Sequence, residues 1–358
     1  MTKFIVNSDN IIHNLDKIKN TAGESVVIAV LKANGYGLGL IQLAKLLSTN
    51  GVNYFAVTDV NDAIKLRDEG IQGEILQLAP VLSENLMKQA VEKGITLCIS
   101  SLGALKAFEE VLTKVENTPS IHINIDTGFG RYGFAPHEIE ELITCVKNND
   151  KLRITGICSH LTFACEKNEA YIRNQVDIFN QCVKLLNDEG IDGMKHIAAS
   201  RGAILYPYTR MDAVRIGSAF LGLLAIENHG YKQVAHLTSA VVEVKSFENG
   251  ARVGYANIPV KNGTKVAVIP CGHYDGFGII RDSNALGLRS ILRKFVNRVL
   301  NKDKKFVSIG NVRANIIGNV GLTDIIVDIT GKSVEVGATA TIACNPLFVN
   351  SNIERVFE

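Results

Sequence analysis

The chain has 358 residues, of which 46% are hydrophobic and 21% charged, and its formal net charge is +2. This composition is typical of a large globular domain with a smaller one, and it excludes a disordered chain. The near balance of charge gives no reason to expect a nucleic-acid or anionic-membrane partner. The densest basic stretch, residues 289–305, also carries apolar residues at helical spacing, so we interpret it as the solvated face of an amphipathic helix.

The seven cysteines are scattered along the chain, and none of them forms a CxxC pair. An odd number at such spacing fits neither a zinc framework nor a disulfide scaffold, and it predicts a reducing compartment. The amino-terminal segment has no uninterrupted apolar core followed by a cleavage site, and no stretch approaches ~18 apolar residues. We therefore expect a cytoplasmic protein.

Short apolar runs alternate with helical patterns over residues 1–235. The expected strands are Val27–Leu31, Tyr54–Val57, Ile75–Leu78, Thr96–Ile99, Ile121–Ile125, Ile154–Ser159, His196–Ala199 and Ala213–Ile216. The expected helices between them include Val60–Glu69, Glu84–Glu92, Leu102–Val115, Pro136–Lys147 and Ala170–Asn187. This alternation implies parallel pairing, and eight strands favour a closed (β/α)8 barrel of the TIM type. The helical pattern is weak at the last two strands, so an open doubly wound sheet remains an alternative.

The texture of the sequence changes near residue 235. From there on, runs rich in Val and Ile are broken by Gly and Asn, and one helical pattern, Leu286–Leu300, interrupts them. This pattern predicts that residues 236–358 form a second, mostly antiparallel β domain.

Ionisable and hydroxyl side chains stand at or just beyond the carboxyl ends of several expected strands, which is where a barrel of this type carries its chemistry. They are Lys32, Asp126, Arg131, His160, Ser200 and Arg215. Taken singly, each has a structural explanation, because a strand-terminal lysine commonly extends to solvent and a serine before a helix commonly caps it. Their joint appearance at successive strand ends favours a functional site.

Lys32 ends a run of buried-strand residues and precedes a glycine-rich turn. Burial among apolar residues lowers the pKa of a lysine and leaves a neutral amine that can form an imine. Such a lysine suggests the cofactor pyridoxal 5′-phosphate, whose phosphate needs backbone N–H groups and hydroxyls at the last strand ends. Gly217 and Ser218, with Ser200 on the preceding strand, supply such groups.

An ordered set of motifs resembles the alanine racemases, which are fold-type III pyridoxal-phosphate enzymes. The motifs are "AVLKANGYGLG", "NIDTGFGRYGF", "GICSHL", "HIAAS", "VRIGSAFLG", "VGYA", "IPCGHYDGFG" and "IGNVGLTDIIVDIT". They span nearly the whole chain, including both expected domains. The resemblance implies an isomerase that interconverts L- and D-alanine and works as a homodimer with shared active sites.

The resemblance assigns two bases of opposite placement, which racemisation needs because a proton leaves one face of Cα and returns to the other. Lys32 is similar to the lysine that binds the cofactor and acts as one base. Tyr255, in "ARVGYAN", resembles the opposing tyrosine, which in this family works in the active site of the partner subunit.

The resemblance also assigns the cofactor contacts. Arg215 resembles the arginine that faces the pyridine nitrogen, and His160 resembles the residue that orients this arginine or lies beneath the ring. An arginine there does not readily give up its proton, so the ring nitrogen stays unprotonated and side reactions are suppressed. Arg131 resembles the arginine that assists the tyrosine and the substrate carboxylate. The phosphate cradle is matched by Tyr36, Ser200, Gly217 and Ser218.

Several positions depart from the family pattern. Asn124 stands where most members have a lysine, often carbamylated, so we expect a bound chloride to balance Arg131. Leu322 and Thr323 replace a Met–Asp pair in the substrate pocket. A tyrosine that lines the entrance has become His273, and the carboxy-terminal tyrosine that touches phosphate and substrate corresponds to Ser351 or Asn352. These departures leave serine, ornithine and lysine open as substrates beside alanine.

Two further functions remain as alternatives. A pyridoxal-phosphate decarboxylase of basic amino acids has the same combination of a barrel and a β domain. Such an enzyme needs a carboxylate to protonate the pyridine nitrogen, at the position where this chain has Arg215. A non-catalytic pyridoxal-phosphate carrier needs the barrel alone, and the second domain with Tyr255 argues against it.

Overall fold

The structure is a computed structural model that describes residues 2–117, 119–162, 169–224, 226, 229–279 and 305–358. It consists of two compact units, one formed by Ser8–Val234 and the other by Met1–Asn7 together with Ala235–Glu358. The helix expected at Leu286–Leu300 lies outside the described residues. No helix within the described part is long and apolar enough to cross a membrane.

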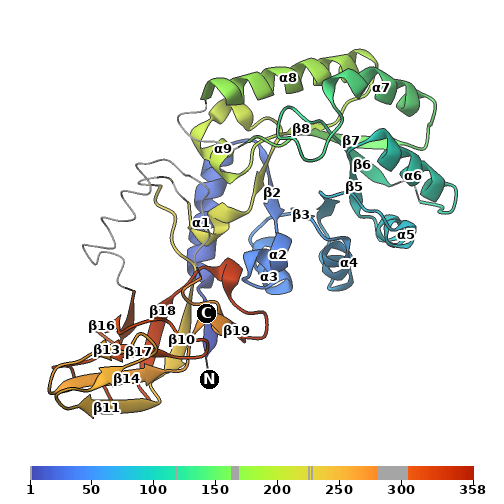
Figure 1. The fold of residues 1–358 in the computed structure, drawn as a ribbon. Coiled ribbons are helices and arrows are strands. Elements are labelled where there is room, and N and C mark those ends of the chain that lie inside the picture. Colours follow the sequence, from blue (N-terminus) through green and yellow to red (C-terminus); the bar gives the residue numbers. More distant parts are fainter. Residues whose placement is uncertain (1, 118, 163–168, 225, 227–228, 280–304) are drawn as a thin grey trace. The chain divides into compact units, whose positions relative to one another are not determined.

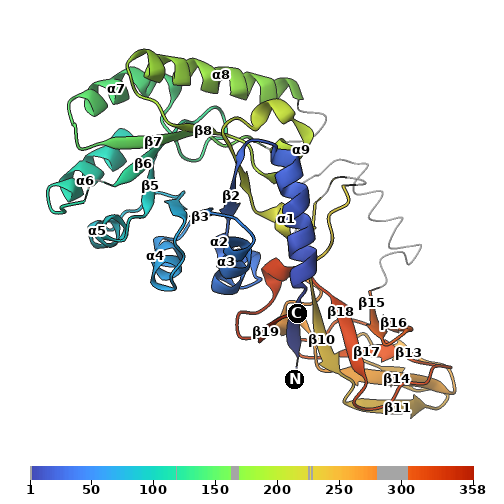
Figure 2. The same ribbon diagram turned by 180° about the vertical axis from the view of Figure 1, so that it is seen from behind.

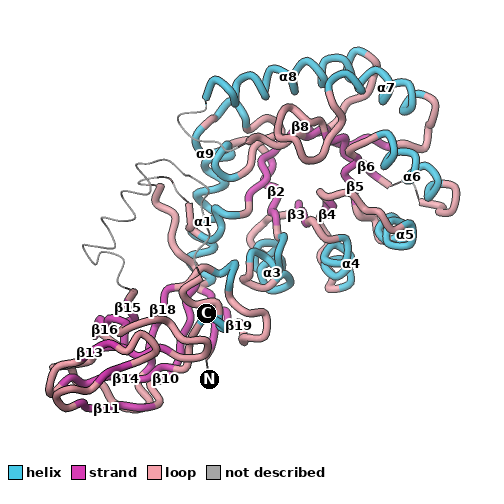
Figure 3. Tube along the Cα trace, viewed as in Figure 1, coloured by secondary structure: helices cyan, strands magenta, loops and turns pink. Residues whose placement is uncertain are grey.

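The first unit holds the eight expected parallel strands (Figures 1 and 3). They are β2 (Val26–Val30), β3 (Tyr54–Val57), β4 (Glu74–Gln77), β5 (Thr96–Ile99), β6 (Ser120–Asn124), β7 (Arg153–Cys158), β8 (Met194–His196) and β9 (Ala213–Ile216). Their hydrogen-bonded order is β8-β7-β6-β5-β4-β3-β2-β9. A parallel bridge between Ala199 and Arg215, with the Arg215 amide donating to the Ala198 carbonyl at 3.0 Å, joins the two outer strands. This closure confirms the predicted (β/α)8 barrel and excludes the alternative of an open doubly wound sheet.

The seventh strand of the barrel begins earlier than expected. The sequence predicts His196–Ala199, whereas β8 spans Met194–His196. The reason is a change of partner, because Met194–His196 pair with β7 and Ala199 pairs with Arg215 near the end of β9. The expected segment is therefore extended backbone that crosses from one neighbour to the other.

Helices surround the strands of this unit (Figure 3). Those that follow the expected patterns are α3 (Leu40–Thr49), α4 (Val60–Asp68), α5 (Glu84–Glu92), α6 (Leu102–Leu112), α7 (Ile139–Lys147) and α8 (Glu169–Asp188). Side-chain caps fix where they begin: Asp59 accepts from the Asn61 amide at 2.9 Å, and Ser101 accepts from the Ala104 amide at 3.1 Å. Strands covered in this way are buried on both faces, as all four residues of β3 are.

The two weak helical patterns correspond to short elements. After β8 comes α9 (Ser200–Leu205), and after β9 comes a single 3-10 turn, η4 (Ser218–Leu221). Helix α1 (Ser8–Ala22) packs against β2 and β9 instead, and Figure 2 shows it beside β2. Its buried Asn14 donates to the carbonyls of Phe220 at 3.0 Å and Lys232 at 2.8 Å. A helix from the start of the unit thus covers the seam that a helix after β9 would cover.

The second unit is a mostly antiparallel sheet of nine strands. Its order is β11 (Glu243–Phe247), β14 (Thr264–Ile269), β17 (Ile325–Asp328), β16 (Val312–Ile316), β15 (Phe306–Ile309), β18 (Thr339–Ala343), β10 (Ala235–Ala240), β1 (Lys3–Val6) and β19 (Arg355–Phe357). Residues 1–7 lie here and not in the barrel unit, because β1 pairs antiparallel with β10 and parallel with β19. A separate short hairpin joins β12 (Arg252–Val253) to β13 (Ile258–Pro259).

Candidate active site

Lys32 directly follows β2 and begins α2 (Lys32–Tyr36), a turn of unusual backbone conformation. Ala33, Asn34 and Tyr36 each have φ of 54°, and Gly35 has φ of 62°. This left-handed region of backbone conformation is unfavourable for residues other than Gly and Asn. The turn is held by the Gly35 amide, which donates to the Leu31 carbonyl at 2.9 Å. The Asn34 side chain accepts from the Leu40 amide, also at 2.9 Å. Lys32 therefore projects from a firmly fixed end of the strand.

The surroundings of Lys32 favour its neutral amine. Burial lowers the pKa of Lys32, and the positive charges of Arg131 and Arg215 lower it further. The Lys32 Nζ atom lies 5.9 Å from the centroid of the Tyr36 ring. A lowered pKa increases the share of neutral, nucleophilic amine at a given pH, which is the form that an imine-forming lysine uses.

A cluster of hydrogen-bond donors lies at the end of β9. The Ser200 hydroxyl oxygen accepts from the Gly217 amide at 3.2 Å and from the Ala219 amide at 3.3 Å. A Cβ atom on Gly217 would lie 2.3 Å from the Tyr36 hydroxyl, so only glycine lets the phenol approach the backbone there. Burial raises the pKa of Tyr36 to about 12, which keeps the phenol protonated as a donor. Ser218 follows Gly217 at the start of η4.

This donor set fits a phosphate group. Two backbone amides, the Ser200 hydroxyl on which they converge and the Tyr36 phenol lie in one small region, and none of them carries negative charge. Together with the Lys32 amine, whose lowered pKa favours imine formation with an aldehyde, these residues have the chemistry that pyridoxal 5′-phosphate requires. The predicted residues Lys32, Tyr36, Ser200, Gly217 and Ser218 come from the two neighbouring strands β2 and β9 and the segment between β8 and β9.

Arg215 is a buried cation with 5% of its surface exposed. Its Nη1 donates to Nδ1 of His196 at 2.6 Å and to the His196 carbonyl at 2.7 Å. Its Nη2 donates to the Ser159 carbonyl at 2.5 Å and to Nδ1 of His160 at 3.2 Å. Within the described part of the chain, no carboxylate forms an ion pair with this guanidinium group. Carbonyls and neutral imidazoles therefore fix its orientation.

The hydrogen bonds of Arg215 continue through the barrel interior. His196 Nε2 lies 2.9 Å from His122 Nδ1, and His122 Nε2 lies 3.0 Å from the Tyr54 hydroxyl. Because Arg215 can only donate, His196 carries its proton on Nε2, and His122 in turn carries its proton on Nε2. Burial and the Arg215 charge lower the pKa of His122 to about 3, so its ring is neutral.

We name this row of side chains, Arg215, His196, His122 and Tyr54, the imidazole ladder. Of its four members, only Arg215 was predicted as a site residue. The available signal was a histidine between two isoleucines in the expected strand 121–125.

Arg131 lies in the loop after β6, exposed to solvent. Its guanidinium carbon is 4.5 Å from the centroid of the Phe129 ring, and the Phe129 ring meets the His160 ring edge-on with centroids 4.9 Å apart. Arg131 is thereby connected to His160 and through it to Arg215. Asn124 turns its amide oxygen toward Cys158, whose thiol donates to it at 3.7 Å.

Tyr255 lies in the second unit, in the tight turn between β12 and β13, with 85% of its surface exposed. Leu322 is also exposed, at 66%, and its carbonyl accepts from the Tyr274 amide at 2.8 Å. The neighbouring Thr323 hydroxyl donates to the Asp324 carboxylate at 3.5 Å. These loops present an aromatic and an aliphatic side chain to solvent.

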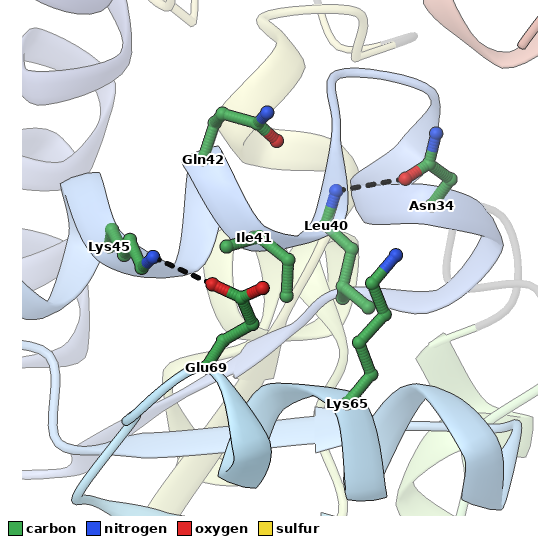
Figure 4. Close-up of a pocket in the computed structure, with 7 residues that line it drawn as sticks. All are labelled: Asn34, Leu40, Ile41, Gln42, Lys45, Lys65 and Glu69. Atoms are coloured by element: carbon green, nitrogen blue, oxygen red, sulfur yellow. Dashed lines mark hydrogen bonds and ion pairs between the residues drawn. The ribbon is translucent and has the colours of Figure 1, made fainter.

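A separate pocket of about 380 Å³ lies on the outer face of the barrel unit, between α3 and α4 (Figure 4). An ion pair of 2.9 Å joins Lys45 to Glu69 at this pocket. Asn34, from the turn after Lys32, reaches it, but none of the predicted site residues does. The described residues that line it are Asn34, Leu40, Ile41, Gln42, Lys45, Lys65 and Glu69.

Two family models cover almost the whole chain. Residues 6–225 match the alanine racemase N-terminal domain, and residues 234–355 match the alanine racemase C-terminal domain. Alanine racemase 2 of Caldanaerobacter subterraneus is 31% identical over 352 residues, covering 94% of this chain and 84% of the relative. The alanine racemase of Methanococcus maripaludis is 29% identical over 341 residues, covering 92% of this chain and 85% of that protein.

Solved structures show the same fold. The alanine racemase of Streptomyces lavendulae superposes with a TM-score of 0.86 at 23% identity, covering 100% of this chain and 97% of that one. The enzyme of E. faecalis gives a TM-score of 0.84, also at 23% identity, with 100% and 98% coverage. With both domain models matched in order, the chain belongs to the alanine racemase family, a family of isomerases.

Proposed function

We propose that this chain is a cytoplasmic enzyme that interconverts L- and D-alanine with pyridoxal 5′-phosphate as its cofactor. The observation that carries the proposal is the pairing of a lysine of lowered pKa, Lys32, with the donor cluster of Tyr36, Ser200 and Gly217. When bound, pyridoxal 5′-phosphate supplies the electron withdrawal that acidifies the Cα–H bond of an amino acid.

The two bases are Lys32 and Tyr255. Lys32 Nζ removes or returns the Cα proton on one face of the substrate, and the Tyr255 hydroxyl does so on the other. We propose that Tyr255 acts in the site of a second copy, so that the enzyme is a homodimer with shared active sites. The exposure of Tyr255 and Leu322 supports this, because both are available to a partner.

The remaining residues bind and orient. Arg131 holds the substrate carboxylate, and Leu322 and Thr323 line the space for the substrate side chain. A chloride beside Asn124 and Arg131 supplies the anion that a carbamylated lysine supplies in other members. Arg215, oriented by His160 and His196, would face the pyridine nitrogen of the cofactor and leave it unprotonated, because a guanidinium does not readily give up its proton. A decarboxylase is disfavoured, because it requires a carboxylate at the position of Arg215.

Chemical labelling tests the cofactor lysine. Purified protein is loaded with pyridoxal 5′-phosphate, reduced with borohydride and digested, and the labelled peptide is identified by mass spectrometry. The label is expected on Lys32 and should be lost in Lys32→Ala. Lys45→Ala, which alters an exposed lysine paired with Glu69, is the matched control and should keep the label. A pyridoxyl group on any other lysine contradicts the proposal.

A further inference from the structure

Helix α8 carries a glutamine, Gln175, whose side-chain amide is fully buried. None of the residues that bind its amide was predicted as a site residue. Gln175 has 0% of its surface exposed. Its Oε1 accepts from the amide of Thr162 at 3.1 Å and from the hydroxyl of the same residue at 3.0 Å. Its Nε2 donates to the Thr127 hydroxyl oxygen at 3.4 Å. One side chain on the outer layer of the barrel thus binds the loop after β6 and the loop after β7.

Thr127 extends this connection inward. Its hydroxyl lies 2.8 Å from the hydroxyl of Ser159, and both residues are almost fully buried. The carbonyl of Ser159 accepts from Arg215, and His160 follows directly. Gln175 is therefore two hydrogen bonds away from the residue whose carbonyl fixes the buried guanidinium.

Arg131 lies in the loop after β6, and helix α8 contacts this loop through a second side chain. The Tyr171 hydroxyl, one helical turn before Gln175, donates to the Gly128 carbonyl at 3.2 Å. Within the loop, the Asp126 carboxylate accepts from the amides of Gly128 and Gly130 at 2.9 to 3.1 Å, which keeps the loop compact. The position of the loop as a whole thus depends on α8.

We propose that Gln175 is a positioning residue that clamps the loop bearing Arg131 to the loop bearing His160, and so sets where the substrate carboxylate binds. This inference rests on the proposed function, in which Arg131 holds that carboxylate. If the two loops moved independently, the distance and orientation between the bound carboxylate and the reacting Cα would vary. Such variation lowers the affinity for the substrate and the rate of the reaction. The clamp removes that freedom with an amide that both donates and accepts.

Gln175→Met tests the clamp, because it keeps the length of the side chain and removes its donor and acceptor. Hydrogen exchange of the segment 126–134, followed by mass spectrometry, should be about tenfold faster than in the wild type, since local opening no longer breaks these bonds. KM for alanine should rise about five- to tenfold, because the three hydrogen bonds lost in this variant no longer hold the Arg131 loop in its binding position. The affinity for pyridoxal 5′-phosphate should change less, because the Ser200–Gly217 cradle lies on other elements.

Gln181→Met is the matched control, since Gln181 lies on the exposed face of the same helix and should leave both readouts at wild-type values. Thr127→Val breaks the same connection from the loop side, and it replaces Gln175→Met if that variant does not fold. Unchanged exchange, or faster exchange with an unchanged KM, would overturn the proposal. A wild type that binds the cofactor without racemising alanine would instead refute the proposed function, while the exchange comparison still decides whether the clamp exists.

Discussion

At the scale of single residues, the site depends on a buried arginine that is balanced by neutral groups. Arg215 donates to two imidazoles and three carbonyls, and its neighbour His196 donates a further hydrogen bond to His122. The cost of this arrangement is that the rings must stay neutral. Burial and the Arg215 charge lower the pKa of His122 and of His160 to about 3 and hold the pKa of His196 well below its ordinary value.

These lowered pKa values predict acid sensitivity. Between pH 3 and 6.5, His122 and His160 are protonated in the unfolded chain but stay neutral in the folded chain. The free energy of unfolding therefore falls as the pH falls below about 6.5. Each such histidine contributes a slope that approaches about 1.4 kcal/mol per pH unit. In urea unfolding between pH 7 and 5, His122→Gln should flatten the slope by about that amount near pH 5.5. The exposed His137→Gln is the control, and an equal slope in wild type and His122→Gln would refute the assignment.

Substrate breadth is also decided by single residues. In the proposed site, Leu322 and Thr323 replace a Met–Asp pair and Ser351 or Asn352 replaces a tyrosine, and we therefore expect the pocket to gain room beside the methyl of alanine. We expect measurable turnover of serine or of a longer side chain, with a modest preference, because one methylene is worth only ~1–3 kcal/mol of discrimination. The measurement is kcat/KM for alanine, serine and ornithine. If both larger substrates are slower by more than about 200-fold, the pocket is closed.

At the scale of elements, the turn after β2 stores backbone strain directly next to Lys32. Ala33 is exposed and has φ of 54°, a conformation that costs an L-residue roughly 1–2 kcal/mol. Ala33→Gly should therefore raise the free energy of unfolding by about 0.5 to 1 kcal/mol, net of the added chain entropy. Ala107→Gly, at an exposed position inside α6, should lower it by a similar amount. Destabilisation by both variants in urea unfolding would show that the turn is unstrained.

Continuous buried strands are the part of this fold that is predicted best from sequence. Strands such as β3 and β5 were predicted at their observed bounds, because each is a continuous buried run. Helix α1 was not predicted, although Ile11, Leu15 and Ile18 repeat at helical spacing, since it precedes the strand at which the alternation begins. The two partners of β1, β10 and β19, both lie more than 200 residues away, and a local pattern carries no information about such pairings.

The candidate site shows the same division. Residues at strand ends, such as Lys32 and Arg215, could be chosen because a barrel places all these ends on one side. The imidazole ladder could not be predicted, because it joins side chains of four strands, and each histidine by itself is equally consistent with a satisfied core residue. Gln175 was missed for a similar reason, since a glutamine within a helix normally faces solvent.

At the scale of the whole molecule, the assignment of the two bases to different copies makes a complementation prediction. Lys32→Ala and Tyr255→Phe should each abolish racemisation. Mixed after reversible dissociation, they should form heterodimers in which one site has both defects and the other has none. About a quarter of the wild-type specific activity is then expected at random assortment in a two-fold dimer. No recovery would place Tyr255 in the site of its own chain or make it structural.

Proton NMR of L-alanine and D-alanine in deuterium oxide with the cofactor-loaded protein tests the proposed racemase activity most directly. The Cα–H signal should disappear from both enantiomers, each should be converted into the other, and Lys32→Ala should do neither. A protein that binds pyridoxal 5′-phosphate on Lys32 but leaves the Cα–H signal of both enantiomers intact would contradict the proposed activity.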